Sequence, residues 1–131
     1  MNDRKIFKCK TTTLVKLRIL ARKLDIDDLI GTTAVIFRKE LISKDELISS
    51  FNKYPYDSDC TEFRQIALYN DVVDKFNEYT TACEVFYNRP MTKVKMLDKI
   101  ITILYHKMID NNQTPVETTL ASSPAVAQTL Q

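Results

Sequence analysis

The scarcity of glycine constrains the fold of this chain more than any other feature. The sequence contains one glycine, Gly31, among 131 residues. Glycine is the usual residue for left-handed backbone positions and for tight β-hairpin turns, so its scarcity disfavours sandwiches and barrels built from many hairpins. We therefore expect an all-α protein, a small bundle of four to five helices.

Length and composition indicate an ordinary globular domain. A chain of this length can bury a hydrophobic core without stabilising cross-links, and 44% hydrophobic with 27% charged residues is typical of globular proteins. Three widely spaced cysteines fit free thiols in a reducing compartment. No apolar segment follows the basic start as in a signal peptide, and no run approaches the roughly 18 apolar residues of a membrane span. We expect a soluble, intracellular protein that does not bind membranes.

The basic residues are concentrated near the N-terminus. Residues 1–24 contain eight basic residues and one acid, a net charge of +7, so the remainder carries −5 against a total of +2. This segment is suited to attract RNA or an acidic protein surface, and the alternative is a solvated helix face. The basic residues are Arg4, Lys5, Lys8, Lys10, Lys16, Arg18, Arg22 and Lys23.

Apolar periodicity and capping signals predict the helices. The first predicted helix repeats Leu14 and Leu17 at helical spacing after a run of threonines that favours an N-cap. The second contains the strand-like stretch TTAVIF but continues into RKELI, which favours a helix. Ser43 and Glu46 form a capping-box pattern that predicts the start of the third. The five predicted helices are 11–24, 29–43, 44–53, 62–88 and 93–110.

The fourth predicted helix, 62–88, carries apolar residues at alternating spacings of three and four. Such a seam indicates a helix that is central to a bundle or shared with a partner, and a homo-oligomeric scaffold is one form of the second case. Asn88 and Pro90 end this helix, and Thr92 is suited to cap the next. The seam residues are Ile66, Tyr69, Val73, Phe76, Thr80, Cys83 and Tyr87.

The fifth predicted helix has a wide apolar surface. One stripe combines leucine, isoleucine and methionine, and Met96, Ile103 and Tyr105 add apolar groups outside it. This width indicates either that a second protein covers part of the helix or that the helix is fully central in the core. Residues 111–131 lose helical patterning and are predicted to be a disordered tail beyond a helical domain of residues 1–110.

No catalytic site can be assembled from these residues. The one histidine, His106, has only Asp110 as a nearby carboxylate, and a packed or surface histidine is the favoured interpretation over a general base. The cysteines lack the close ligand pairs of a zinc site, and one glycine cannot form a phosphate-binding loop. We expect a non-enzyme with no catalytic residues, no metal site and no cofactor.

Three short segments resemble the small helical replicase subunit of coronaviruses, non-structural protein seven. FKCKTTTLVKLRIL, 7–20, resembles the family's opening, in which a Lys-Cys pair precedes a first helix rich in Leu and Val. ALYNDVV, 67–73, is similar to the family's second helix, and LDKIITIL, 97–104, to its third. The chain departs from the family at Tyr69, where histidine is usual. It also departs in two segments that look inserted, 29–60 and 77–90.

The resemblance to this nidovirus family implies a non-catalytic cofactor of a viral RNA-dependent RNA polymerase, within a replication complex in the host cytoplasm. Such a cofactor binds a second helical replicase subunit, similar to non-structural protein eight, and meets RNA through the complex. The implied polymerase contacts are Lys8, Cys9, Tyr69 and Asn70. The implied partner-helix contacts are Leu14, Leu17, Leu97, Ile100, Ile101 and Leu104. The implied RNA-proximal residues are Lys10, Lys16 and Arg18.

The chain ends in Leu130-Gln131, after a stretch with almost no charge. Coronavirus main proteases prefer Leu-Gln immediately before the cleaved bond, so the resemblance implies a polyprotein cleavage product and a main protease as a partner. The alternative is a chance dipeptide.

A self-contained basic helical module that binds nucleic acid is the alternative to the cofactor. Four of the six tyrosines fall on predicted helix stripes, where packing explains them, while Tyr54 and Tyr56 lie in the loop 53–60. A self-contained module would bind RNA alone with a steep dependence on salt concentration.

Overall fold

The computed structural model describes residues 3–56 and 59–110 and contains a two-stranded sheet among helices. The strands are β1 (Arg4–Lys10) and β2 (Phe63–Tyr69). The helices are α1 (Thr11–Leu24), α2 (Leu29–Arg38), α3 (Lys44–Ser50), α4 (Asn70–Tyr87) and α5 (Lys93–Tyr105), and a π-helical turn, η1 (His106–Asp110), extends α5. The expectation of an all-α bundle is therefore wrong, and the fold is mixed although mostly helical.

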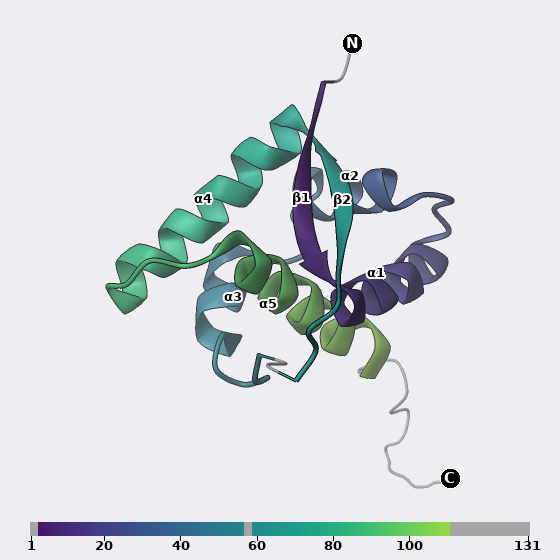
Figure 1. Cartoon of the computed structure of the whole chain (residues 1–131). Coiled ribbons are helices and arrows are strands. Elements are labelled where there is room, and N and C mark those ends of the chain that lie inside the picture. The colour runs from purple at the N-terminus through teal and green to yellow at the C-terminus, as the bar shows by residue number, and fades with distance from the viewer. Residues whose placement is uncertain (1–2, 57–58, 111–131) are drawn as a thin grey trace, which may run out of the picture.

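The two strands pair in antiparallel register without a hairpin. Phe7 lies opposite Ile66, and Lys10 lies opposite Phe63. Three helices separate the strands in sequence, so no tight turn joins them and no glycine is required (Figure 1). Glycine scarcity disfavours tight hairpins, but it does not disfavour strands that pair over this distance in sequence.

Left-handed backbone positions in this chain are occupied by residues other than glycine. Asp25 and Asn88 follow the last residues of α1 and α4 with φ of 59° and 55°, and Glu40 has φ of 49°. Aspartate and asparagine tolerate this conformation better than most residues. The predicted end of a helix at Asn88 is confirmed.

Several local predictions are confirmed, and three are wrong. One wrong prediction is the end of the helix predicted over 29–43, since α2 ends at Arg38. The capping box is present, since the Ser43 hydroxyl accepts from the Glu46 N–H and the Glu46 carboxylate accepts from the Ser43 N–H, each at 3.0 Å. Thr92 caps α5, and TTAVIF lies in helix α2. The threonines do not cap α1, since Thr11 is already its first residue. The predicted helix 62–88 is instead a strand followed directly by α4.

Helix α5 forms the centre of the core. Nine consecutive residues, Met96–Leu104, are buried on all sides. The polar members have partners: Asp98 accepts from Thr13 at 3.0 Å, and the Lys99 ammonium donates to the carbonyls of Phe51 and Tyr54 at 2.8 and 2.7 Å. Burial lowers the pKa of Lys99. The wide apolar surface of this helix is explained by its central position.

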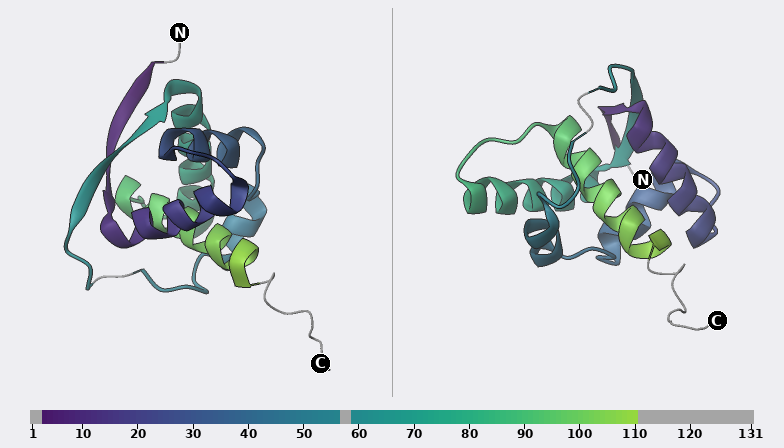
Figure 2. Two further views of the ribbon diagram at one scale, coloured as in Figure 1. Left: turned by 90° about the vertical axis from the view of Figure 1, so that its right-hand side faces the viewer. Right: turned by 90° about the horizontal axis from the view of Figure 1, so that it is seen from below.

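The ribbon of β1 and β2 covers one side of the helices. Its inner face carries Phe7, Cys9, Ile66 and Leu68 onto the core, where the Phe7 ring lies 5.9 Å from that of Phe76 on α4. Figure 2 (left) shows the ribbon at one edge of the molecule, with the helices on its other side.

Candidate binding surface

The residues predicted to seat partner helices lie in the core. Leu14 and Leu17 of α1 are buried, and so are the four residues of the α5 stripe, each at most 5% exposed. A partner helix cannot reach these side chains while the domain is folded. The placement of a partner site on them is therefore corrected: these six residues stabilise the monomer. They are Leu14, Leu17, Leu97, Ile100, Ile101 and Leu104.

The seam of the predicted helix 62–88 is also internal. Ile66 lies on β2, and Val73, Phe76, Thr80 and Cys83 on α4, and all five are buried. The other two seam residues, Tyr69 and Tyr87, are half-buried, so the seam does not form a continuous exposed stripe for a homo-oligomeric scaffold.

The predicted polymerase contacts divide between surface and interior. Lys8 and Asn70 are exposed, at positions along the ribbon and immediately after it. Cys9 is buried on the inner face, where burial raises its pKa to about 11. Tyr69 is half-buried beneath the Arg38 guanidinium, 5.2 Å from its ring. Lys8 and Asn70 can therefore contact a partner directly, whereas Cys9 cannot.

The predicted RNA-proximal residues also differ in access. Arg18 is exposed on α1. The Lys16 ammonium donates to the Thr102 hydroxyl at 2.9 Å, which ties α1 to α5. Lys10 is only 3% exposed, and its ammonium lies 4.1 Å from the Tyr56 ring centroid. Only Arg18 of the three extends freely from the surface. The predicted cleavage residues, Leu130 and Gln131, lie outside the described residues.

Four ion pairs of the described residues lie outside β1 and α1, although exposed cations without an ion pair also occur elsewhere in the described ranges, at Lys39, Lys53, Arg64, Arg89 and Lys93. The four cations of the described ion pairs all come from residues 38–107, and they join α2, α3, α4, η1 and the α2–α3 connection. Arg38 and Asp71 form a two-point contact at 2.7 and 2.8 Å, and the guanidinium lowers the pKa of the Asp71 carboxyl. In the described ranges, six exposed cations on β1 and α1 form no ion pair. We call these the N-terminal cations: Arg4, Lys5, Lys8, Arg18, Arg22 and Lys23.

The outer face of the ribbon combines these cations with apolar groups. Strand alternation places Arg4, Ile6 and Lys8 of β1 on the same face as Phe63 and Gln65 of β2. Ile6 is 59% exposed and Phe63 is 39% exposed. We call these five residues the ribbon face. The cations of this face are evident from composition, but the strand pairing that brings Phe63 beside Lys8 is known only from the structure.

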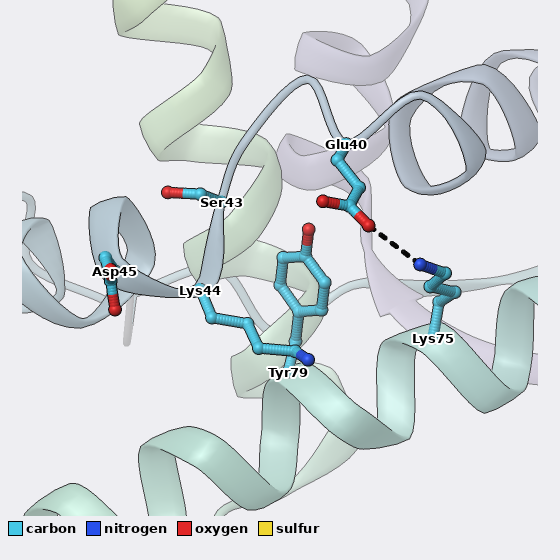
Figure 3. Close-up of a pocket in the computed structure, with 6 residues that line it drawn as sticks. All are labelled: Glu40, Ser43, Lys44, Asp45, Lys75 and Tyr79. Atoms are coloured by element: carbon cyan, nitrogen blue, oxygen red, sulfur yellow. Dashed lines mark hydrogen bonds and ion pairs between the residues drawn. The ribbon is translucent and has the colours of Figure 1, made fainter.

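A small polar hollow between α3 and α4 has both of its lysines paired with carboxylates. Lys75 contacts Glu40 at 2.8 Å, and Lys44 contacts Glu78 at 3.1 Å. Figure 3 shows the Tyr79 ring between these two lysines, and its hydroxyl donates to the carbonyl of Ile42. Each of these groups is committed within the protein, so the hollow holds no preformed set of ligand-binding groups.

The described part of the chain brings together no three His, Cys, Asp or Glu side chains suited to hold a metal ion. His106 stacks on Tyr54 at 4.1 Å with nearly parallel rings, which is a packing arrangement. Cys60 is partly exposed, and its Sγ lies 3.4 Å from the Thr11 hydroxyl at the start of α1. That hydrogen bond, with one from the Thr12 backbone, lowers the pKa of Cys60 to about 7.

The fold and surface define a small α+β domain with a basic, partly apolar ribbon. None of the helices that the structure describes combines the length and apolar character needed to span a bilayer. Comparison of the chain with known protein families, with curated proteins and with solved structures gives no match.

Proposed function

We propose that this chain is a non-catalytic module that binds nucleic acid through its N-terminal cations. One observation carries the proposal: β1 and α1 present six exposed cations and contain no Asp or Glu, and none of these six cations has an ion-pair partner among the described residues. Unpaired cations keep their full attraction for phosphates, and a bound phosphate backbone releases its counterions.

The size of the electrostatic contribution follows from the number of cations. If each of the six cations meets one phosphate of a single strand, the slope of log K against log salt concentration is about −4. Fewer contacts would give a proportionally smaller slope. The isolated chain is therefore expected to bind a labelled oligonucleotide at low salt and to lose most of that affinity as salt is raised.

The test is fluorescence anisotropy with the full chain and two charge-matched variants. Arg18→Glu with Arg22→Glu reverses two N-terminal cations, and Lys39→Glu with Lys53→Glu reverses two exposed lysines elsewhere. Both variants change the net charge by the same amount. We expect at least a tenfold loss of affinity for the first and a loss of less than about threefold for the second. Equal losses, or no binding by the wild-type chain at low salt, would contradict the proposal.

The polymerase-cofactor function implied by the resemblance is a second candidate, and one observation favours it. Lys8 and Asn70, two of the implied polymerase contacts, are both exposed, Lys8 on the ribbon and Asn70 immediately after it at the start of α4. In this interpretation the ribbon, and not the α5 stripe, meets the polymerase or the second helical subunit. Reconstitution with the polymerase and second subunit from the same genome tests it. Lys8→Glu and Asn70→Ala should reduce stimulation of RNA synthesis, and unchanged stimulation would exclude this contact.

A further inference from the structure

The ribbon face has an aromatic ring at one end of a row of cations. Arg4 and Lys8 lie on one side of β1, about 13 Å apart at the usual rise of a strand. Ile6 lies between them, and Phe63 is on β2. Ile6 and Phe63 therefore add exposed apolar surface directly beside these cations. The combination indicates a ligand with both negative charge and an apolar surface.

Two lysines lie near the Phe63 ring, one buried and the other exposed. The buried Lys10 ammonium lies 6.0 Å from the Phe63 ring centroid and 4.1 Å from that of Tyr56, which fixes the cation between two rings. The exposed Lys8 ammonium lies 5.2 Å from the same Phe63 centroid. Lys8 is free to exchange this cation–π contact for a phosphate, because its side chain is solvated.

A shallow hollow of about 220 Å³ adjoins the ring. It is lined by Ile6, Phe7, Lys8, Phe63, Arg64 and Gln65. This volume is below the range of about 300–1,000 Å³ in which whole small-molecule ligands are enclosed. The hollow is therefore suited to a small flat group that belongs to a larger ligand, with the rest of the ligand lying outside.

We propose that the ribbon face binds single-stranded nucleic acid, with one base stacked on Phe63 and the adjoining phosphates held by Lys8 and Arg4. This inference rests on the proposed nucleic-acid function and specifies its ligand. An unpaired base offers an open π-face to an aromatic side chain, whereas a duplex hides the faces of its bases. An acidic peptide would satisfy the cations but would leave Ile6 and Phe63 without a role.

The chain contains no tryptophan, so a single tryptophan introduced at the site reports binding there by its fluorescence. Phe63→Trp places a single indole on the ribbon face, and Phe86→Trp places one on α4, where Phe86 is 64% exposed. Titration of the full chain with an oligouridylate of about ten nucleotides should quench Phe63→Trp fluorescence. The same titration of Phe86→Trp should leave the signal unchanged, and so should a duplex of equal length added to either variant.

Affinity measurements with Phe63→Ala separate this inference from the proposed function. Anisotropy with the oligouridylate should show a loss of about 5- to 150-fold for Phe63→Ala, with duplex affinity changed less than threefold. Phe63→Tyr should keep most of the affinity, and Phe86→Ala should lose none. Far-UV circular dichroism checks that each variant is folded.

Each other outcome has a defined consequence. If the oligouridylate binds but Phe63→Ala weakens single strand and duplex equally, or neither, the stacking inference is overturned while the proposed function stands. If neither nucleic acid binds at low salt, both fail. If polyglutamate binds as tightly as the oligouridylate and depends on Phe63 in the same way, the face is a peptide site and the inference is overturned.

Discussion

Replacement of Ile100 by alanine tests whether α5 belongs to the core or to a partner interface. Ile100 is 0% exposed at the centre of α5. The substitution removes three carbon atoms, which at about 0.8 kcal/mol for each buried methylene is a loss of about 2.4 kcal/mol in transfer free energy. The cavity left behind adds to this, so the free energy of unfolding should fall by about 2–5 kcal/mol.

The measurement is urea denaturation of the isolated chain, followed by far-UV circular dichroism. With an m-value near 2 kcal/mol/M, the expected loss moves the midpoint down by about 1–2.5 M urea. The matched control is Val15→Ala on α1, where the side chain is 52% exposed, and its effect should stay within about 0.5 kcal/mol. Ile100→Asp should prevent folding, because it places an unpaired carboxylate in the core.

The reasoning fails if Ile100→Ala and Val15→Ala have the same midpoint and m-value. That result would mean that Ile100 is not enclosed in the isolated chain and that the α5 stripe is free to receive a partner helix. A midpoint that rises with protein concentration would point the same way, because association would then contribute to the stability of the fold.

Three further predictions concern the thiols and the start of α2. In the native chain iodoacetamide should modify Cys60 before Cys9 and Cys83, with a rate that rises as pH passes about 7. The reason is that hydrogen bonds lower the pKa of Cys60, while burial raises the pKa values of the other two thiols to about 11. Mass spectrometry checks the order of modification, and a rate that rises only near pH 9 would contradict the prediction. Asp28→Ala should cost about 1 kcal/mol in urea denaturation, because the Asp28 carboxylate accepts from the Gly31 N–H at 2.6 Å and caps α2. Gly31→Ala should change the free energy of unfolding more favourably in the Asp28→Ala variant than in the wild-type chain, since the added methyl would lie 2.5 Å from the Asp28 carboxylate oxygen. Equal effects in both chains would refute this coupling.

The features predicted correctly from sequence are those fixed by a few neighbouring residues. The capping box at Ser43 and Glu46, the cap at Thr92 and the helix end at Asn88 each depend on residues within one or two turns. Helix α2 was predicted despite TTAVIF, but the reason given was wrong, because α2 ends at Arg38 and leaves the rest of RKELI outside the helix. Local chemistry decides these points, so the sequence contains enough information for them.

The strands were missed because their stability comes from pairing across three helices. In β2, Ile66 and Leu68 alternate as a strand requires, but Ile66, Tyr69 and Val73 also fit helical spacing. The choice between them depends on the inner face of β1, which is distant in sequence. Pattern alone cannot rank a strand with a remote partner against the first turns of a helix.

The width of the apolar surface on α5 shows a second limit. A helix with apolar residues on every side is either central in its own domain or shared with another chain, and sequence periodicity is identical in both cases. The decisive contacts are polar: Lys99 reaches the carbonyls of Phe51 and Tyr54, and Lys16 reaches Thr102. These contacts close the domain around α5, and sequence spacing does not predict them.

The enclosure of α5 determines where binding can be separated from folding. Substitutions in the buried stripe change the free energy of unfolding, so any loss of binding that they cause cannot be assigned to a contact. Lys8 and Phe63 extend from the outer face of the ribbon, while the inner face of the same strands holds the core contacts of Cys9 and Ile66. Because the two faces alternate along the same seven residues, the outer side chains can be changed while the core contacts are kept. A ligand that depends on these outer residues in a fully folded chain must therefore bind the ribbon itself.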